Sequence, residues 1–312
     1  MPRQCAISSI SGDRAVSEAT AEHGGPIRLA TRGSRQALAQ STAVAEAITS
    51  ATGRAVELVL IETIGDIRAD VPLHQIGGQG VFVKEVQRAA LDGRADIAVH
   101  SAKDLPSAPA DGLDLAAFTE RRTPADALVG CTLDGLPVGA TVATGSVRRR
   151  AQLSSVRPDL EFVELRGNID SRLSKVPDGG AIVMAVAALQ ILEMTDRIAE
   201  QLPVDVFVPA VGQGCVAVEC RDGDASTRSA LAAIDHRPTR HDVATERAFL
   251  AELGSGCSLP VGAHVRSGRL WTFLADLDRG TSVTDVADLS GDPLADVELA
   301  CAAARAARRA LA

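Results

Sequence analysis

The stretch DIAVHSAKDLP, residues 96–106, decides how the rest of the chain is interpreted. Its apolar run, Ile97 to Val99, is typical of a buried strand, and Pro106 ends any regular continuation. Between them stands a charged pair, Lys103 and Asp104. Ligands in an open α/β sheet bind beyond the carboxyl ends of strands, where such a pair can hold a charged ligand and move protons. A surface ion pair after a strand is the competing interpretation, and the rest of the chain has to decide between the two.

Strands and helices alternate on both sides of this stretch. We expect strands at 27–31, 56–62 and 113–118, and helices at 37–52 and 83–92. That order is typical of a mainly parallel α/β domain. The segment 63–80 is long and rich in glycine, and we interpret it as a mobile lid over a site.

The sequence predicts a second α/β domain and two crossings between the domains. Residues 120–126, with Pro124, form the first crossing, and residues 206–214 form the second. The elements expected between them are strands at 141–144, 162–165 and 181–185 and a helix at 187–193. A strand at 216–219 then returns to the first domain. Two domains joined by two crossings imply a cleft between them and hinge motion.

The last part of the chain predicts a small α+β domain. A helix at 243–253 precedes a loop of small residues that carries Cys257. A ligand can reach a thiol in such a loop, although a buried, inert cysteine is the commoner state. Antiparallel strands across 265–289, with Trp271 and Phe273 in the core, and a helix at 297–312 complete the domain.

The expected fold is therefore α/β, with two domains around a central cleft and a smaller third domain. The expected boundaries are an extension at 1–26, domain 1 at 27–119 and 212–238, domain 2 at 125–209, and domain 3 at 243–312. The first 26 residues lack the apolar segment of a signal peptide and contain acidic residues. We expect them to be weakly ordered rather than a targeting segment.

Basic side chains gather just after strand ends in both predicted α/β domains. The groups are Arg32 with Ser34, then Arg148, Arg149 and Arg150, then Arg166 with Arg172. The first group stands at a strand–helix turn, where free N–H groups favour an anion, although Ser34 also suits an ordinary helix N-cap. The second falls in the first turn of a helix, where the dipole disfavours positive charge. We interpret it as an anion site rather than as solvated arginines, because its position costs stability unless an anion lies opposite.

Composition excludes several classes of function. The net charge of −8, with 2% aromatic residues and no tyrosine, argues against nucleic-acid binding. No apolar run is long enough to span a bilayer. The six cysteines are scattered and form no CxxC pair, so we expect no metal site and a reduced, cytoplasmic protein. An acidic chain with local arginine clusters predicts a small anionic ligand.

Seven motifs, in this order, resemble the hydroxymethylbilane synthase family, also called porphobilinogen deaminases. They are ATRGSRQALAQ (30–40), GGQGVFVKE (77–85), RADIAVHSAKDLP (94–106), ATGSVRRRAQL (143–153), LRGNIDSRLSK (165–175), PAVGQG (209–214) and GSGCSLPVG (254–262). The resemblance runs from about Ile27 to the C-terminus and leaves out only the first 26 residues.

The resemblance implies a fold, a reaction and a cofactor. The fold is two domains like type II periplasmic binding proteins around a central cleft, with a small α+β C-terminal domain. The reaction is the polymerisation of porphobilinogen into a linear tetrapyrrole with loss of ammonia. The cofactor is a dipyrromethane joined by a thioether to a loop cysteine, which by motif position is Cys257. We also expect a monomer with no nucleic-acid or membrane partner.

The resemblance also implies roles for individual residues. The catalytic aspartate falls on Asp104, with Lys103 beside it. The residues implied to hold the cofactor, besides Cys257, are Arg32, Ser34, Lys103, Asp104, Thr144, Ser146, Arg148, Arg149, Arg166, Gly167 and Arg172. Those implied for substrate are Arg32, Arg148, Arg149, Arg166, Arg172, Arg197 and Phe82, the last beside the lid. Guanidinium groups suit this task because porphobilinogen carries an acetate and a propionate, which arginine binds in a fixed, bidentate geometry.

The chain departs from the family pattern at several positions. Some members carry Arg where this chain has Ile64, and Ser where it has Gly145. They carry Asp and Arg where this chain has Thr123 and Ala125, and Pro and Leu where it has Arg35 and Gln36. Because this chain lacks an arginine at 64 and a hydroxyl at 145, we expect one contact to a ligand carboxylate to be weaker than in those members. Neither position removes the aspartate, the cysteine or the main set of arginines, so an active enzyme is expected.

Three other functions fit the predicted fold. A non-catalytic binding protein for a small dicarboxylate would use the same cleft, but it has no need of a thiol in a third domain. A specialised paralogue with altered kinetics would keep the same motifs. A transcriptional effector domain would need a DNA-binding segment, and the sequence has none of the usual signals.

Overall fold

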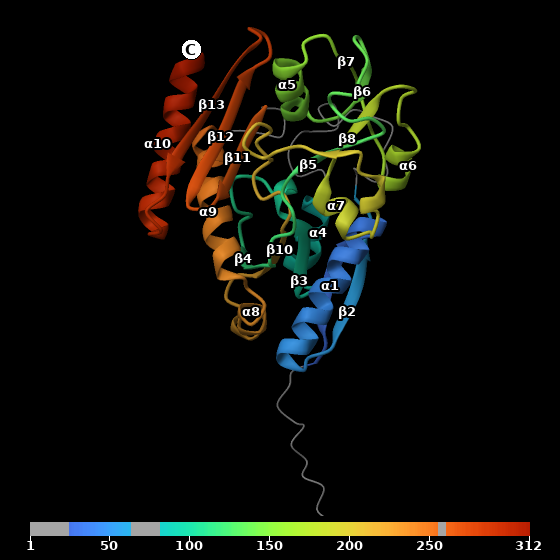
Figure 1. Ribbon diagram of the computed structural model, residues 1–312. Helices are drawn as coiled ribbons and strands as arrows, with labels where there is room; N and C mark the ends of the chain where they lie inside the picture. Colours follow the sequence, from blue (N-terminus) through green and yellow to red (C-terminus); the bar gives the residue numbers. More distant parts are fainter. Residues whose placement is uncertain (1–24, 64–81, 255–259) are drawn as a thin grey trace, which may run out of the picture.

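The computed structural model describes residues 25–63, 82–254 and 260–312, which form three units (Figure 1). Lobe 1 is built on a five-stranded sheet in the order β2-β1-β3-β10-β4. Its strands are β1 (Ile27–Arg32), β2 (Val56–Ile61), β3 (Ile97–Ser101), β4 (Leu113–Phe118) and β10 (Val216–Arg221). β1 is parallel to β2 and β3, whereas β10 runs antiparallel to β3 and β4. β1, β2, β3 and β4 therefore run in one direction and only β10 opposes them, so the sheet is mainly parallel in strand direction, as predicted.

Helices cover both faces of this sheet. α1 (Arg35–Thr52) and α8 (Ala225–Ala232) pack on one face, where Val44, Ile48 and Leu231 join the buried core. α4 (Lys84–Leu91) packs on the other face through Val86 and Ala89. The short 3₁₀ helix η1 (Ala102–Asp104) follows β3 directly. Two-sided cover of this kind explains why most residues of β1 and β3 are buried.

Lobe 2 has the same arrangement of strands, in the order β7-β6-β8-β5-β9, but its fourth strand, β5, comes first along the chain of its lobe whereas β10 comes last. Its elements are β5 (Asp126–Val129), β6 (Thr141–Ala143), α5 (Val147–Val156), β7 (Glu161–Val163), α6 (Ile169–Leu173), β8 (Ala181–Ala185), α7 (Val186–Gln190), η2 (Thr195–Arg197) and β9 (Glu200–Gln201). β5 is antiparallel to both of its neighbours, while β6 is parallel to β7 and β8. Residues 119–125, the first crossover, lead from β4 into this sheet. Residues 202–215, the second crossover, lead from β9 back to β10.

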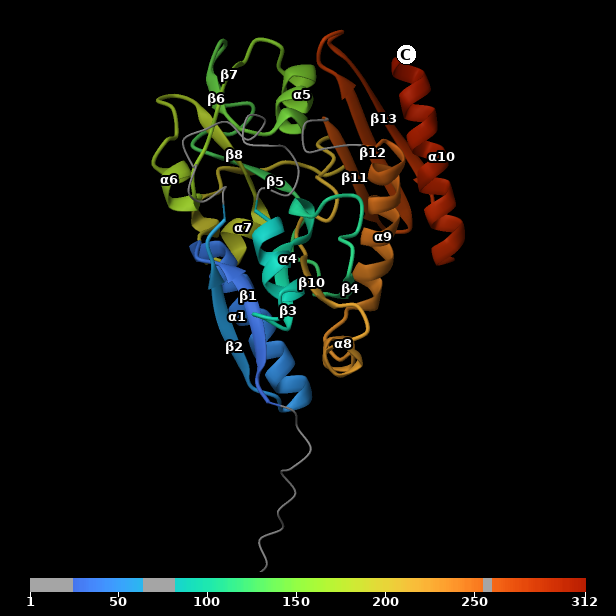
Figure 2. The same ribbon diagram turned by 180° about the vertical axis from the view of Figure 1, so that it is seen from behind.

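A smaller C-terminal unit packs beside both lobes (Figures 1 and 2). Its antiparallel sheet has the order β11-β12-β13, with β11 (Val261–Arg266), β12 (Arg269–Asp276) and β13 (Thr281–Asp288). α9 (Arg237–Glu252) and α10 (Pro293–Leu311) share a buried core with one face of that sheet. On the other face, Phe273 packs against Val208 of the second crossover and Ala151 of α5.

The fold class predicted from the sequence is confirmed: two α/β lobes and a small α+β unit. The return of the chain to the first sheet through β10 is confirmed as well. β5, β9 and α8 were not predicted, because β5 and β9 are too short to show a period and α8 has little apolar contrast between its faces. Trp271 is half-buried rather than fully in the core. The boundaries of the three domains stay a prediction.

Several predictions fall outside the described residues. They concern Cys257, Ile64, most of the lid segment and the first 24 residues. Among the residues that are described, none of the helices combines the length and apolar character needed to cross a bilayer.

Candidate active site

The turn after β3 carries the Lys103–Asp104 pair into the space between the lobes. β3 is buried up to His100, and η1 then turns the chain so that the side chains of Lys103 and Asp104 line a cavity. The second crossover runs close against this turn. Gly212 has φ +67°, and a Cβ atom there would lie 3.0 Å from the Cβ of Ala102. Only glycine combines this backbone conformation with so close an approach, so Gly212 fixes the second crossover against the pair.

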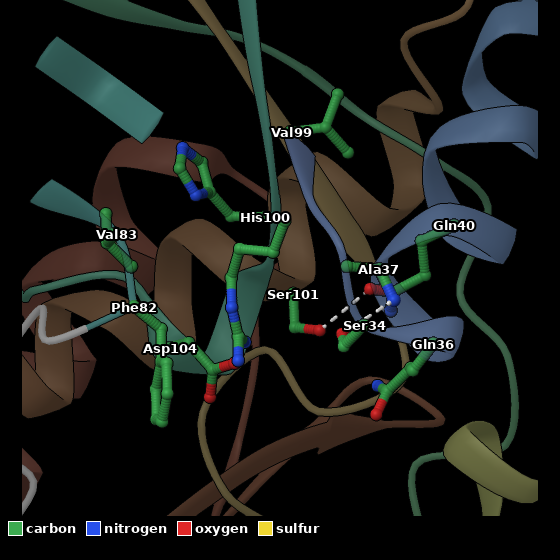
Figure 3. Close-up of a pocket in the computed structure, with 11 residues that line it drawn as sticks. Ser34, Gln36, Ala37, Gln40, Phe82, Val83, Val99, His100, Ser101 and Asp104 are labelled. Carbon is green, nitrogen blue, oxygen red and sulfur yellow. Dashed lines mark hydrogen bonds between the residues drawn. The ribbon is translucent and has the colours of Figure 1, made fainter. Parts of the chain in front are cut away.

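A small pocket of about 50 Å³ lies between this turn and the start of α1. Its walls include Arg32, Ser34, Phe82 and Asp104, all predicted site residues (Figure 3). The guanidinium carbon of Arg32 lies 4.0 Å from the centre of the Phe82 ring, which is a cation–π contact. Ser34 is the N-cap of α1 and accepts a hydrogen bond from the backbone N–H of Ala37. The sequence therefore placed this turn correctly, and the ordinary capping role of Ser34 is present.

A larger cavity of about 250 Å³ lies between the lobes and the C-terminal unit. It joins predicted residues from both lobes, namely Lys103, Asp104, Ser146, Arg148, Arg149, Arg166 and Arg172. Leu250 of α9 and Val261 of β11 close it from the C-terminal unit. Asp104 borders both this cavity and the smaller pocket.

Arg148 and Arg149 face a buried carboxylate that the sequence analysis did not single out. Arg148 lies 2.8 Å and Arg149 lies 2.7 Å from the two carboxylate oxygens of Asp126. Burial alone would raise the pKa of this carboxyl group, but the two guanidinium groups hold its pKa well below the usual range. The anion expected opposite the positive helix start is thus, at least in part, a side chain of the protein.

The remaining donors of the two arginines are directed at backbone oxygens. Nη1 of Arg148 donates to the carbonyl of Val208 at 2.7 Å, and Nη1 of Arg149 donates to that of Val183 at 3.0 Å. Arg148 is only 4% exposed, and burial lowers its pKa despite the nearby Asp126. The pair is therefore rigid, and it lines the cavity as a fixed positive wall.

Gln213 of the second crossover connects this wall to Lys103. The Lys103 ammonium donates to Oε1 of Gln213 at 3.3 Å, and Nε2 of Gln213 donates to Asp126 at 2.8 Å. Burial, followed by the positive charge of Arg149, lowers the pKa of Lys103 to about 8. The cavity thus holds a lysine whose charge changes near physiological pH, beside the aspartate predicted to be catalytic.

Arg166 and Arg172 also line the cavity, from the turn after β7 and from α6. Nε of Arg172 donates to the carbonyl of Gly167 at 2.8 Å. Burial and the neighbouring Arg149 lower the pKa of Arg172 to about 10, so the guanidinium stays charged at neutral pH. Gly167 itself has φ +115°, and a Cβ there would clash with the Ser171 hydroxyl. The glycine is needed for the turn that aims Arg166 inward.

Thr144 and Ser146 support the start of α5. The Thr144 hydroxyl accepts from the N–H of Ser146 at 3.2 Å, and Ser146 caps the helix at Arg149. Gly145 between them lines the cavity, but a Cβ there would lie 2.9 Å from the carbonyl oxygen of Leu165. A serine at this position, as in some family members, would require a shift of the Leu165 backbone.

One predicted residue lies away from both cavities. Arg197 is exposed on η2 and borders neither of them in the described structure. Cys257 lies outside the described residues, but it stands four positions before Val261, which lines the larger cavity.

A buried ion pair fixes the junction of the three units. Arg121 of the first crossover binds Glu246 of α9, with Nη1 2.6 Å from the carboxylate. Glu246 also accepts from the backbone N–H groups of Gly212 and Val265. Burial opposes the charge of Glu246, yet Arg121 and His264 together lower its pKa to about 2. Sequence analysis missed this pair and the Asp126–Gln213 contacts, because residues distant along the chain form them.

Fold and site together define a two-lobed α/β protein with a cationic cavity between its lobes. The chain belongs to the porphobilinogen deaminase family. The family model "Porphobilinogen deaminase, dipyromethane cofactor binding domain" matches residues 27–229.

Curated relatives named porphobilinogen deaminase match most of the chain. The protein of Thermobifida fusca is 51% identical over 247 residues, which cover 77% of this chain and 76% of the relative. That of Geobacter sulfurreducens is 43% identical over 281 residues, covering 87% of each chain. That of Nitratidesulfovibrio vulgaris is 47% identical over 261 residues, covering 80% of this chain and 83% of the relative.

Solved structures show a more distant similarity. A TRAP periplasmic solute binding protein from Desulfovibrio salexigens is 10% identical, with a TM-score of 0.41, over 69% of this chain and 73% of its own. Immunogenic lipoprotein A from Vibrio vulnificus is 12% identical, with a TM-score of 0.40, over 69% of this chain and 96% of its own.

Proposed function

We propose that this protein is a transferase that joins four porphobilinogen units head to tail with release of ammonia. The product is the linear tetrapyrrole hydroxymethylbilane, used in porphyrin and heme biosynthesis. One observation carries the proposal beyond family membership. Asp104 borders an interlobe cavity whose other charged lining residues are a lysine and four arginines. A chain of pyrroles that gains two carboxylates with each unit needs a site of this charge.

The cavity suits a dipyrromethane cofactor. Such a group is a short, apolar pyrrole chain with carboxylates on its edges, and the walls combine Leu105, Val183 and Val261 with the arginines. The bound cofactor would supply a free pyrrole carbon as the primer on which the chain grows. Arg166 and Arg172 would hold its carboxylates, since Arg148 and Arg149 already share Asp126.

Cys257 is the residue that we propose to carry the cofactor. The residues on either side of its loop, Leu250 and Val261, both line the cavity. Of the cysteines that the structure describes, Cys131, Cys215, Cys220 and Cys301, none borders this cavity. Burial raises the pKa of Cys215 to about 12, which makes that thiol a poor nucleophile.

Asp104 is the group that we propose to move the proton. As an anion it would stabilise the positive charge that develops as ammonia leaves, and in its protonated form it would donate to the leaving amine. Lys103 beside it would bind a substrate carboxylate while its ammonium is charged. Arg32, which lies against Phe82, would bind the next carboxylate from the smaller pocket.

The intact mass of the purified protein tests this function. We expect an increment equal to two joined pyrrole units, which disappears in Cys257→Ala. Cys131→Ala, a half-buried cysteine away from the cavity, is the matched control and should keep the increment. A wild-type protein with no added mass, and no turnover of porphobilinogen, would reject both the function and the attachment site.

We further propose that the protein works as a cytoplasmic monomer without nucleic-acid or membrane partners. Its acidic net charge of −8 supports the absence of such partners, because nucleic acids and anionic membranes repel a surface of that charge. Analytical ultracentrifugation of the purified protein should give a single species of one chain mass, and a stable dimer would contradict it.

A further inference from the structure

A second cavity lies at the junction of the crossovers and shares no lining residue with the candidate active site. Its volume is about 440 Å³. We call it the hinge pocket, and it is lined by Arg121, Arg122, Thr123, Pro124, Ala125, Gln201, Leu202, Pro203, Val204, His264, Val265 and Arg266. The first crossover forms one wall, the start of the second crossover forms another, and β11 closes the pocket from the C-terminal unit.

Three arginines line the hinge pocket, and only one of them has a carboxylate partner among the described residues. Glu246 binds Arg121 through both terminal nitrogens, so that guanidinium is neutralised. Arg122 and Arg266 are exposed, and within the described residues neither side chain has a hydrogen-bond or ion-pair partner. No Asp or Glu stands among the described residues that line the pocket. Two unpaired guanidinium groups in one hollow are unexpected on a chain with a net charge of −8.

Apart from the uncharged polar residues Thr123 and Gln201 and the histidine His264, the rest of the lining is apolar. Ala125, Leu202 and Val204 are buried, and Pro124 and Pro203 lie between them. A bare inorganic anion would leave this surface unused, whereas a compact hydrocarbon body would cover it. Carboxylates on that body would suit the planar donors of the two arginines.

We propose that the hinge pocket binds a small organic dianion, an aromatic or similarly compact apolar body that carries two carboxylates. Arg122 binds one carboxylate from the first crossover, and Arg266 binds the other from the end of β11. Because the three walls belong to the segments that join the units, the bound dianion connects both lobes to the C-terminal unit.

The chain contains its own reporter for this pocket. Trp271 is the single tryptophan, and tyrosine is absent. Trp271 is paired in register with His264, a pocket residue on the neighbouring strand. Directly opposite residues of an antiparallel pair have Cβ atoms roughly 5 Å apart. Occupation of the pocket should therefore change the emission of Trp271.

The experiment is a titration of the purified, cofactor-bearing protein with phthalate, benzene-1,2-dicarboxylate, followed by tryptophan fluorescence and calorimetry. We expect a saturable signal by both methods. Benzylamine, a cation of similar size, should give none, and inorganic phosphate should bind at least about tenfold more weakly. No saturable phthalate signal, or equal binding of phosphate, would overturn the proposal.

Variants assign the signal to the hinge pocket rather than to the candidate active site. The double variant Arg122→Ala/Arg266→Ala should weaken phthalate binding by roughly tenfold or more. Arg309→Ala, an exposed arginine of α10 outside the pocket, removes a similar charge and should change little. Unchanged affinity in the double variant would mean that phthalate binds elsewhere.

Thr123 offers a test of charge alone. Thr123→Asp places a carboxylate on the pocket wall and should weaken phthalate binding as strongly as the double variant. Thr123→Asn has almost the same shape without the charge and should keep the wild-type affinity. Equal binding by the Asp and Asn variants would contradict an electrostatic site. Circular dichroism of each variant checks that the fold is retained.

Discussion

The two lobes share one arrangement of strands but use its equivalent positions differently. β1 and β6 occupy the same place in their sheets, and each leads through a serine cap, Ser34 or Ser146, into a helix. β3 and β8 are also equivalent, yet β3 leads into η1, which carries Lys103 and Asp104, whereas β8 continues into the apolar helix α7. The carboxylate that we propose to be catalytic thus belongs to lobe 1, and the buried guanidinium pair belongs to lobe 2.

The fourth strands, β10 and β5, sharpen the contrast. Each is antiparallel and each carries a buried carboxylate, Glu219 in lobe 1 and Asp126 in lobe 2. Asp126 neutralises two arginines that line the cavity. Glu219 accepts from the Gln87 amide at 2.9 Å, and Nε2 of His100 lies 3.0 Å from its carboxylate. The buried carboxylate of the fourth strand therefore holds neighbouring side chains of the core in lobe 1, whereas in lobe 2 it holds the arginines that line the cavity.

The largest expected effect comes from the difference between β3 and β8. Asp104→Ala should leave the fold and the covalent cofactor in place but reduce turnover of porphobilinogen by at least about a hundredfold, because the proton-transferring group is lost. Steady-state assays and intact mass measure the two properties together. Asp111→Ala, at an exposed loop position, is the control. Near-normal turnover of the Asp104 variant would reject its catalytic role.

The two buried carboxylates should differ in their contribution to stability. Asp126→Asn leaves two buried guanidinium groups without a counter-charge, and we expect the free energy of unfolding to fall by about 3–5 kcal/mol. Glu219→Gln loses contacts with a neutral amide and a histidine, so a loss of about 1–3 kcal/mol is expected. Urea denaturation at neutral pH measures both. If the two losses are equal, or their order is reversed, the contrast between the lobes does not hold.

Asp126 also predicts how stability depends on acid. Its pKa in the folded protein is held below that of an unfolded aspartate, which is about 3.9. The stabilisation is therefore complete above that value and is lost as the pH falls toward the lower folded pKa. Urea midpoints measured between pH 5 and pH 2 should fall more steeply for the wild type than for Asp126→Asn.

Lys103 should set the alkaline limit of activity. Because burial and Arg149 lower its pKa to about 8, the ammonium that we propose to bind a substrate carboxylate is lost as the pH rises through that value. Lys103→Arg keeps its charge, so its activity should persist to higher pH even if its maximum is lower. The pH profile of kcat/KM for both proteins tests this. A wild-type profile that is flat from pH 7 to 9.5 would contradict it.

The lowered pKa of Lys103 should affect stability in the opposite direction from activity, because it makes the folded protein more stable as the pH rises. The folded pKa of Lys103 lies below that of an unfolded lysine, about 10.4, so the unfolded chain binds more protons between these values. The contribution of this residue to the free energy of unfolding therefore rises with pH from about 8 to about 10.4. Lys103→Met should lack this rise.

The smallest expected effect is at the rim between the lobes. Arg35 of α1 lies 3.1 Å from Asp170 of α6, and both side chains are more than half exposed. Because water and salt screen such a pair, a double-mutant cycle with Arg35→Ala and Asp170→Ala should give a coupling of about 0.2–1 kcal/mol that decreases with salt. A coupling well above this range would mean that the pair holds the lobes together.

Local patterns determined much of this protein. The apolar run before Lys103, the serine-capped turns and the cluster after β6 identified the strand ends that border the cavity. Such patterns work because strand and helix periods, caps and turns depend on neighbours within a few residues. The motifs that carry the family resemblance are of the same kind.

Tertiary structure decided which charges meet. Asp126 lies 23 residues before Arg149, at the end of a crossover whose direction no local period reveals. Its place opposite the arginines depends on the register of β5 against β8 and on Gln213 from a distant segment. The hinge pocket likewise exists only because three segments, far apart in the sequence, pack side by side. A local pattern specifies what each segment forms, but the pairing of charges depends on how the buried faces of distant elements pack together.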